Sequence, residues 1–457
     1  MRRFPQKTTL TMAAFLAFLE LLNAIPLLRE YKVMDWATVP AVLEFTPRKT
    51  SSTPVVDEQQ RMRPDIDPAS YGTYAVEDPA RNLDRFYAAL ERTERREPGA
   101  VTRILHYGDS PTTADQITAD VRALMQAQFG NAGHGFCLVA KPWAWYGHRG
   151  VELHGSGWKI EPANQAGMRD GMYGLGGATF LGGPEASSRI ALRNAVHARA
   201  EVAYLRWPGG GAFSVASNKR PLAEVETAAG KAEPAWVAVR VPAGVSELEI
   251  QPVRGVVRLF GASFENPGPG VIYDSLGVNG AHVAMLARMF NSEHWAGELQ
   301  HYRPQLVVVN YGTNESVYPS FVDKGFGNEL RTIVRRLREA VPEASILIMS
   351  PMDRGQRSTG GDIGTVPVMA RLVAMEESIA LETGCAFFNT FQAMGGPGTM
   401  GKWYAAEPRL VGADFIHPLP AGARIVGNLL YRGLTNGYNR YKLRRMQEKF
   451  AKMGSKQ

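Results

Sequence analysis

The sequence predicts an α/β fold with a mainly parallel, doubly wound sheet, an inserted all-β segment and an apolar N-terminal helix. Three observations lead to this prediction. Short apolar runs alternate with helical periodicity over residues 101–136 and again over 271–430, as in a parallel sheet with helices on both faces. Residues 140–270 carry strand-like runs separated by Gly, Pro and Asn, which is typical of a β sandwich. Residues 8–28 are almost uninterruptedly apolar.

Length and charge limit the classes of protein to consider. A chain of 457 residues is too long for one compact core, so we expect two domains with appendages. Much of the net charge of +7 lies at the two ends of the chain, which argues against a nucleic-acid-binding face across the fold. Cys137 and Cys385 stand alone and supply no metal framework. They could pair in an oxidising compartment, but two separate buried thiols are the more ordinary arrangement.

Residues 1–30 are typical of a signal anchor. A basic start precedes an apolar stretch close to the ~20 residues that span a bilayer. No small-x-small cleavage site follows, so we expect an uncleaved transmembrane helix with the remainder of the protein in the periplasm or outside the cell. Glu20 is costly in lipid and is expected to face a partner helix or a helix end. Residues 31–82, rich in Pro, Ser, Thr, Asp and Gln in their later part, are expected to be a linker or stalk.

The first part of the α/β domain, residues 83–139, contains the stretch around which the site is organised. A helix is expected over 78–97, because Asp78-Pro79 is a suitable start. An apolar strand from Val101 to Leu105 follows, and helical periodicity begins shortly afterwards. Ser110 therefore lies where a strand passes into a helix, which is where α/β proteins place reactive groups.

Residues 140–270 are expected to form the inserted β domain. Strand-like runs lie at 188–192, 200–205, 236–241, 248–252 and 256–260. The segment also holds six large aromatic residues, namely Trp143, Trp145, Tyr146, Trp158, Trp207 and Trp236. Exposed aromatic rings on a β domain can stack on sugars, although core packing explains any one of them at least as well.

The α/β pattern returns over residues 271–435, and residues 436–457 are expected to be a basic C-terminal tail. The strand-like runs are 271–273, 306–310, 346–349 and 385–388, and helical patterns are clearest over 327–340 and 367–383. Strands that alternate with helices predict parallel pairing. The β segment is therefore inserted into the sheet domain after its first strand–helix unit.

Four polar side chains follow these strands or lie in loops of the same pattern: Ser110, Asn314, Asp414 and His417. They could converge, because the carboxyl ends of parallel strands share one sheet edge. A histidine can take the proton of a serine hydroxyl, and an aspartate three residues earlier can orient the imidazole. The backbone N–H groups of Ser110 and Gly280 and the Asn314 amide could bind an oxyanion. This set of residues predicts acyl transfer through a serine nucleophile.

Four short motifs stand in the order of the four blocks of the SGNH/GDSL hydrolases: Gly108-Asp109-Ser110, Gly277-x-x-Gly280, Gly312-x-Asn314-Glu315 and Asp414-x-x-His417. The chain resembles that family over about residues 100–136 and 271–430. The resemblance implies a flavodoxin-like three-layer sheet and ester hydrolysis without a metal or other cofactor. By the same resemblance Ser110 is the nucleophile, and Gly280 and Asn314 complete the oxyanion hole. Asp414 and His417 complete the triad.

A closer resemblance is to the peptidoglycan O-acetylesterase-like branch of this family. It rests on Ala114-Asp115 after the serine, on Phe129-Gly130 and the glycines that follow, on Gly312-Thr313-Asn314-Glu315, and on a β insert similar to a carbohydrate-binding module. The chain has Pro111 where relatives often have His, and Glu315 where Asp is more usual in the wider family. These differences leave the predicted triad intact and leave the substrate open.

Other polar residues are given structural roles. His134, His148, His154 and His282 have an irregular spacing that fits no metal-ligand motif, so surface or structural positions are expected. Asp274 is expected in a turn. Asp109 is expected to brace the nucleophile loop through backbone hydrogen bonds.

Three functions remain in competition. The preferred one is an exported serine esterase that removes O-acetyl groups from peptidoglycan or another cell-wall or secreted polysaccharide. The second is a polysaccharide O-acetyltransferase with the same triad, supplied by a membrane-bound acyl-donor protein. The third is a non-catalytic polysaccharide-binding protein that uses the β insert. The complete set of four motifs argues against the third function, whereas the sequence does not separate the first two.

Overall fold

The computed structural model describes residues 71–72, 74–165, 170–193, 197–241 and 247–454, which belong to one compact unit. The predicted anchor over 1–30 and most of the predicted linker over 31–82 lie outside these residues. None of the helices in the described part of the chain has the length and apolar character needed to cross a bilayer.

The α/β domain is built on a five-stranded parallel sheet in the order β13-β1-β14-β15-β18. Its strands are β1 (Val101–Gly108), β13 (Gly270–Gly277), β14 (Leu306–Asn310), β15 (Ser345–Met349) and β18 (Ala386–Phe388). The longer helices are α4 (Asp84–Glu94), α6 (Gln116–Phe129), α7 (Ser292–Tyr302), α9 (Gly327–Ala340), α10 (Met369–Glu382) and α13 (Pro420–Gly454). The shorter helical segments are α5 (Ser110–Thr113), η3 (Met285–Met289), η4 (Glu315–Val317), α8 (Pro319–Phe321), η5 (Val322–Phe326), α11 (Thr390–Ala393) and α12 (Thr399–Ala405).

The side chains of β14 show why the sheet is covered on both faces. Leu306 and Val308 pack into one apolar core with α4, α6 and α13, whereas Val307 and Val309 pack into a second core with α7, α9 and α10. Successive residues of a strand point to opposite faces, so a strand buried on both sides reads as an unbroken apolar run. The predicted three-layer α/β arrangement is therefore present.

The first helix is shorter than the sequence predicts. The helix expected over 78–97 begins at Asp84 and ends at Glu94. Arg81 and Arg96 both adopt a left-handed backbone conformation, with φ of 55° and 57°, which a continuous α-helix excludes. Asp78 lies before the helix, where its carboxylate accepts the N–H groups of Asn82 and Leu83 at 2.7 and 2.9 Å.

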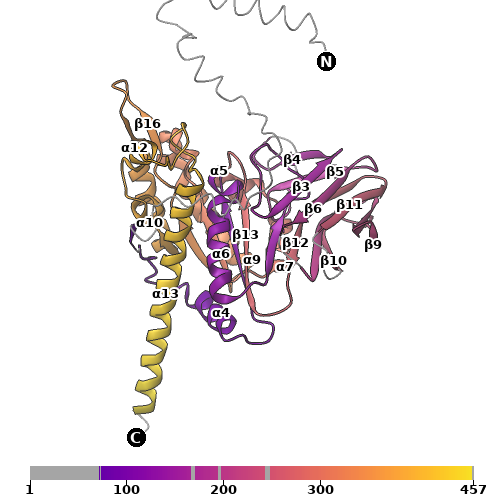
Figure 1. Ribbon diagram of the computed structural model, residues 1–457, viewed down its shortest axis with the longest axis horizontal. Helices are drawn as coiled ribbons and strands as arrows, with labels where there is room; N and C mark the ends of the chain where they lie inside the picture. The colour runs from indigo at the N-terminus through magenta and orange to yellow at the C-terminus, as the bar shows by residue number, and fades with distance from the viewer. Residues whose placement is uncertain (1–70, 73, 166–169, 194–196, 242–246, 455–457) are drawn as a thin grey trace, which may run out of the picture. The chain divides into compact units, whose positions relative to one another are not determined.

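The inserted segment forms two antiparallel sheets, which Figure 1 shows gathered on the side of the described structure opposite α13. One has the order β10-β7-β12-β5-β4 with β2 also paired to β12, and the other has the order β3-β6-β11-β8-β9. Tyr204 of β7 and Phe213 of β8 stack edge to face across the two sheets, with ring centroids 5.2 Å apart. The strands are β2 (Gly133–Cys137), β3 (Val151–Ser156), β4 (Lys159–Pro162), β5 (Ala178–Gly182), β6 (Ser187–Leu192), β7 (Arg199–Arg206), β8 (Ala212–Ser217), β9 (Arg220–Glu226), β10 (Glu233–Arg240), β11 (Glu247–Arg254) and β12 (Val257–Glu265).

Strand β2 begins within the glycine-rich stretch that follows Phe129. Gly133 and Gly135 have φ of +136° and +88°, and a Cβ on Gly135 would lie 2.4 Å from Asp274 Oδ1. The glycines therefore let β2 pass directly over the sheet and pair with β12. Asp274 itself is a buried residue within β13 rather than part of a turn, and it accepts the Phe136 N–H at 2.6 Å.

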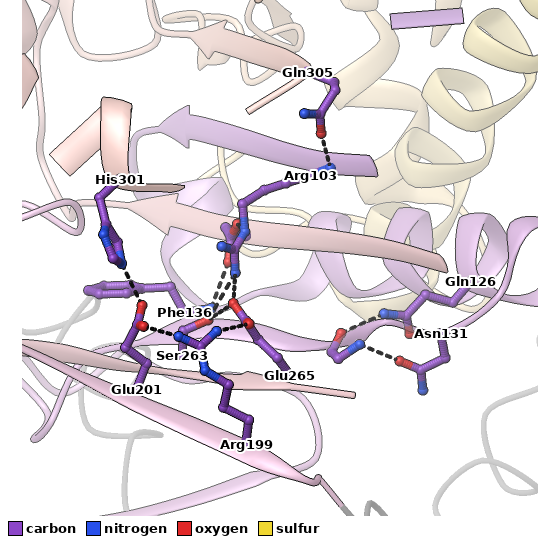
Figure 2. Close-up of polar contacts among 12 residues, drawn as sticks. Arg103, Gln126, Asn131, Phe136, Arg199, Glu201, Ser263, Glu265, His301 and Gln305 are labelled. Carbon is purple, nitrogen blue, oxygen red and sulfur yellow. Dashed lines mark hydrogen bonds and ion pairs between the residues drawn. The ribbon is translucent and has the colours of Figure 1, made fainter. Parts of the chain in front are cut away.

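A buried ion network joins the parallel sheet to the insert (Figure 2). Arg103 of β1 contacts Asp274 of β13 at 3.0 Å, and Ser263 and Glu265 of β12 at 2.9 and 3.0 Å. The Arg103 side chain is only 8% exposed and that of Asp274 is fully buried. A guanidinium with several donors is well suited to satisfy carboxylates from two domains at once.

The insert is also tied to helix α7 at this junction. His301 contacts Glu201 of β7 at 2.6 Å, and Arg199 pairs with both Glu201 and Glu265 (Figure 2). The partly buried ring of Trp236 stacks on His301 with a centroid separation of 3.8 Å. This tryptophan thus packs at the junction between the insert and the α/β domain.

Residues 436–454, expected to be part of a tail, continue helix α13. Three of their cations contact acidic residues of α4: Lys442 contacts Glu94 at 3.1 Å, Arg445 contacts Glu91 at 3.0 Å, and Arg444 contacts Asp84. Part of the C-terminal charge is therefore paired within the fold. Cys137 and Cys385 are separate, buried free thiols.

Candidate active site

Three of the predicted site residues form a chain of hydrogen bonds at the carboxyl edge of the parallel sheet. His417 Nε2 lies 2.8 Å from Ser110 Oγ, and His417 Nδ1 lies 2.6 Å from Asp414 Oδ2. Asp414 Oδ1 also accepts the backbone N–H groups of Ile416 and His417 at 3.0 and 3.1 Å. The Asp414 and His417 side chains are 47% and 44% exposed, so solvent reaches this side of the chain.

Local backbone geometry explains how these residues reach one another. Strand β1 ends at Gly108, where a Cβ would lie 2.2 Å from Thr112 Oγ1, so the chain can turn sharply into α5 beginning at Ser110. The loop that carries Asp414 is closed by a hydrogen bond from Gly412 N–H to the His417 carbonyl at 2.8 Å. Phe415 within it has a φ of 57°, which keeps the loop compact.

The two predicted oxyanion-hole residues lie on loops that contact each other. Gly280 has a φ of +70° in the turn after β13. The Asn314 amide donates to the carbonyl of the next residue, Ala281, at 2.9 Å, which leaves its second N–H for another acceptor. The structure thus joins the Gly280 loop to the Asn314 loop directly.

Glu315 holds these two loops together, which the sequence does not reveal. Its side chain is fully buried, with Oε1 accepting the Val283 N–H at 2.6 Å and Oε2 accepting the Gly312 N–H at 3.0 Å. Burial raises the pKa of Glu315 to about 7. The extra methylene relative to Asp gives the carboxylate the reach to bridge both backbones. Its position directly after Asn314 is the only signal in the sequence.

Asp109 lies next to the serine and is also buried. Burial raises the pKa of the Asp109 carboxyl to about 7, although hydrogen bonds with Thr313 act to lower it. The expected bracing role therefore includes contact with the Asn314 loop. Asp109 Oδ2 has no hydrogen-bond partner in the described part of the chain.

The raised pKa of Asp109 predicts a specific pH dependence of stability. Between about pH 4 and 7 the carboxyl is ionised in the unfolded chain and protonated in the folded one, so it contributes less stability as the pH rises. Asp109→Asn is expected to make this decline shallower, by an amount on the order of a few kcal/mol across that window. Urea denaturation at several pH values measures it. The exposed Asp323→Asn is the control, and parallel pH curves for Asp109→Asn and wild type would contradict the prediction.

The structure brings together a cluster that sequence spacing did not suggest. Single ligand atoms of Asp115, His134 and His148 lie within 4.8 Å of one another. However, the Asp115 carboxylate already accepts hydrogen bonds from the Arg122 guanidinium and from the Arg149 backbone at 3.0 Å. Because Arg122 supplies the positive charge that a metal would bring, we interpret the cluster as a structural joint.

This joint holds the first loop of the insert against α6. Burial lowers the pKa of His148 to about 4, which favours its neutral form, and its Nδ1 lies 3.2 Å from His134 Nε2.

The other two histidines lie outside this cluster. His154 is exposed on β3, and His282 is half-buried near Tyr318, with a ring-centroid separation of 6.3 Å. The neighbouring Trp143 donates its indole N–H to Thr113 Oγ1 at 3.0 Å, only three residues from Ser110.

Comparison with known proteins supports the family resemblance. Residues 243–425 match the GDSL-like Lipase/Acylhydrolase family. The matched range includes Gly280, Asn314, Asp414 and His417 but not Ser110, which lies on the other side of the insert. No curated protein matches the sequence significantly.

Among solved structures, one described as "Peptidoglycan O-acetylesterase in action, 5 min" has 20% identity and a TM-score of 0.68 over 80% of this chain and 99% of its own. A family two carbohydrate esterase from Clostridium thermocellum has 13% identity and a TM-score of 0.26, covering 61% of this chain and 100% of its own. A salicylyl-acyltransferase from a tetracycline biosynthetic pathway has 14% identity and a TM-score of 0.28, covering 63% and 98%. The first comparison shows a shared fold, and the resemblance that the four motifs predicted is confirmed.

Proposed function

We propose that this chain, whose residues 243–425 match the GDSL-like acylhydrolases, is an exported serine esterase that removes O-acetyl groups from a cell-wall or secreted polysaccharide. The observation that carries the proposal is the chain of hydrogen bonds from Ser110 through His417 to Asp414, at 2.8 and 2.6 Å. A nucleophile, a base and a group that orients the base are what ester hydrolysis through an acyl-enzyme requires.

The reaction follows from this geometry. His417 Nε2 accepts the Ser110 proton as Oγ attacks the ester carbonyl. The backbone N–H groups of Ser110 and Gly280 and the free N–H of Asn314 then donate to the oxyanion. When the intermediate collapses, His417 returns the proton to the departing sugar hydroxyl. Water repeats the sequence on the acetyl-serine, with His417 as base, and releases acetate and the free serine.

Asp414 remains ionised throughout this cycle. Partial burial acts to raise its pKa, but hydrogen bonds from the His417 side chain and from the backbone N–H groups of Ile416 and His417 outweigh burial and lower it to about 2. A carboxylate that keeps its charge fixes the imidazole with Nε2 facing the serine. It also stabilises the imidazolium that forms during attack.

Two features support a carbohydrate substrate. The structure with the same fold is described as a peptidoglycan O-acetylesterase. The insert places Trp143 beside Thr113, and in the same loop Trp145 is 67% exposed, as expected for a ring that could stack on a sugar near the serine. The predicted N-terminal anchor would hold this domain on the extracytoplasmic side of a membrane.

The test is to follow product formation from 4-nitrophenyl acetate and from an acetylated oligosaccharide, with and without an acceptor sugar. Free acetate as the main product in the presence of acceptor supports hydrolysis. Acetylated acceptor formed at the expense of acetate would instead identify an O-acetyltransferase, whose donor would then be sought among membrane proteins. No acetate and no transfer, with any of these substrates, would contradict the proposal.

Asn314→Ala is expected to lower kcat by about 100-fold, which corresponds to the ~3 kcal/mol typical of a lost oxyanion donor. KM should change little, because this hydrogen bond strengthens only in the transition state. Steady-state kinetics on 4-nitrophenyl acetate measures both values. Asn164→Ala, which removes a different amide bonded to the Gly280 loop at the Asn279 carbonyl, is the matched control. An unchanged kcat would remove Asn314 from the oxyanion hole.

A further inference from the structure

A cavity of about 500 Å³ opens beside Asp414, and the mechanism above does not use it. Four segments form its walls. Two are the turn after Asn314 and the loop that carries Asp414, and the other two, residues 354–357 and 366–368, lie at the two ends of a small hairpin of β16 (Gly355–Arg357) and β17 (Ile363–Thr365). The residues that matter most in its lining are Ser316, Val317, Arg354, Arg357, Asp414 and Phe415. The cavity meets the hydrogen-bonded chain at Asp414, and neither Ser110 nor His417 lines it, so a group bound there would belong to a part of the substrate beyond the ester.

Arg354 brings a partly buried positive charge to this cavity. Its Nη1 donates to the Thr313 carbonyl at 2.7 Å and to Ser316 Oγ at 3.2 Å. Burial lowers the pKa of Arg354, and the nearby charges of Asp109 and Asp414 act in the opposite direction without reversing the shift. Within the described residues no carboxylate comes within 4 Å of its guanidinium.

Arg357 adds a second guanidinium, on an exposed residue of β16. It lies over the Phe415 ring, 5.2 Å from the centroid, and its Nη1 donates to the Gly361 carbonyl at 2.9 Å. As with Arg354, the described part of the chain offers it no carboxylate within ion-pair distance. A guanidinium placed over an aromatic ring keeps its remaining N–H groups available to an acceptor.

The buried arginines elsewhere make the contrast clear. Arg103, Arg122 and Arg258 are buried, and each contacts at least one carboxylate of the protein. Arg336 is also buried, and it donates through both Nη1 and Nη2 to the Leu286 and Phe290 carbonyls. Arg354 is half-buried and Arg357 is exposed, and within the described residues each donates hydrogen bonds through Nη1 alone, which leaves Nε and Nη2 for an anionic ligand.

Asp414 also borders the cavity, but its charge is already engaged. Its two oxygens accept three hydrogen bonds from His417 and Ile416. Two arginines and this one aspartate are the charged residues of the lining, so the cavity keeps a net charge of +1. Behind the wall, Asp353 is engaged as well, since its carboxylate accepts Thr365 Oγ1 at 2.8 Å and the Met400 N–H at 2.9 Å.

We propose that Arg354 and Arg357 form a subsite for a sugar carboxylate, so that the natural substrate is an acidic polysaccharide whose carboxylate lies beyond the acetylated hydroxyl. This inference rests on the proposed esterase function of Ser110. A planar carboxylate matches the paired N–H groups of a guanidinium. Uronic acids and the lactyl ether of muramic acid both supply this group, and the experiment separates them.

Binding is measured first, because it does not depend on turnover. The full-length Ser110→Ala protein in detergent is titrated with oligogalacturonate and its methyl ester, and with the disaccharide of N-acetylglucosamine and N-acetylmuramic acid and chitobiose. In each pair the second ligand lacks the charged carboxylate. We expect at least one acidic ligand to bind about tenfold more tightly than its neutral partner, and the pair that shows the preference identifies the source of the carboxylate.

Arg357→Gln in the same background is expected to remove that preference, whereas the exposed Arg240→Gln on β10 is expected to retain it. Arg357 is the residue to replace because Arg354 also holds the Asn314 loop through Thr313. Equal binding of acidic and neutral ligands in both pairs, or a preference that survives Arg357→Gln, would overturn the subsite.

Kinetics then connects the subsite to catalysis. With Ser110 intact, Arg357→Gln should lower kcat/KM about tenfold more for an acetylated acidic oligosaccharide than for its neutral counterpart, chiefly through KM. An equal effect on both substrates would refute the subsite while leaving the esterase proposal in place. Wild-type protein that hydrolyses no acetyl ester would refute the esterase proposal, and the binding comparison would still decide the subsite.

Discussion

Ser110→Ala is expected to reduce turnover of 4-nitrophenyl acetate by at least about 10⁴-fold, to the level of background hydrolysis. Without the hydroxyl no acyl-enzyme can form, and losses of ~10⁶ accompany removal of the serine in other Ser-His-Asp hydrolases. The fold should be unaffected, because the Ser110 side chain makes its one described hydrogen bond to His417. Burst-phase and steady-state release of nitrophenol measure the loss.

The control for this experiment is Ser156→Ala, which removes an exposed hydroxyl on β3 that is bonded to Ser187. It should retain wild-type activity. Circular dichroism of Ser110→Ala should overlay that of the wild type. Activity of Ser110→Ala within tenfold of the wild type, with the fold intact, would show that another residue is the nucleophile.

Arg103→Met is expected to destabilise the protein by about 3–5 kcal/mol. Methionine fills part of the same volume but leaves Asp274 and Glu265 without their shared cation, and breaking one side of a buried ion pair typically has an effect of this size. Burial already raises the pKa of Asp274 with Arg103 present. Without the arginine the carboxyl should take up a proton, so the deficit should grow as the pH rises above the ordinary pKa of an aspartate, about 4.

Urea denaturation monitored by tryptophan fluorescence gives the free energy of unfolding for this comparison. Arg199→Met is the matched control, because it removes a more exposed arginine that pairs with Glu265 in the same network. Its effect should stay near 1 kcal/mol or below. Similar losses of unfolding free energy for the two variants would mean that burial does not make the ion pairs of Arg103 more stabilising than those of Arg199.

The sequence predicts correctly those strands and helices whose apolar residues follow a regular local pattern. Strand β14 is found over the predicted residues, because burial on both faces requires an unbroken apolar run. Helix α9 is also found as predicted over 327–340, since its apolar positions recur at helical spacing. Ser110, Asp414 and His417 meet because the carboxyl ends of parallel strands lie at the same edge of the sheet. The order of strands and helices along the sequence is therefore enough to predict this long-range contact.

Contacts made by loops that fold back over long distances could not be predicted in this way. The loop at 141–150 folds back onto α6 and brings His148 to Asp115 and His134. The positions of these three residues in the sequence therefore do not predict that they form a cluster. Strand β2 depends on glycines that pass over Asp274. The cavity beside Asp414 depends on a short polar hairpin without hydrophobic periodicity. Whether Gly280 and Asn314 bind an oxyanion, and where the domains divide, remain predictions.

The pairing of β1 with β13 has a consequence for how the protein folds. Val101 pairs with Gly270 and Gly108 with Gly277. Strand β1, which leads to Ser110, therefore pairs with residues that lie 169 positions later in the chain (270 − 101). Closing a flexible loop of that length opposes folding by about 4–5 kcal/mol of entropy. If the insert forms first, β2 and β12 bring its two ends together, and the remaining loop is several times shorter. Folding is therefore expected to proceed from the insert outward, with Ser110 placed last.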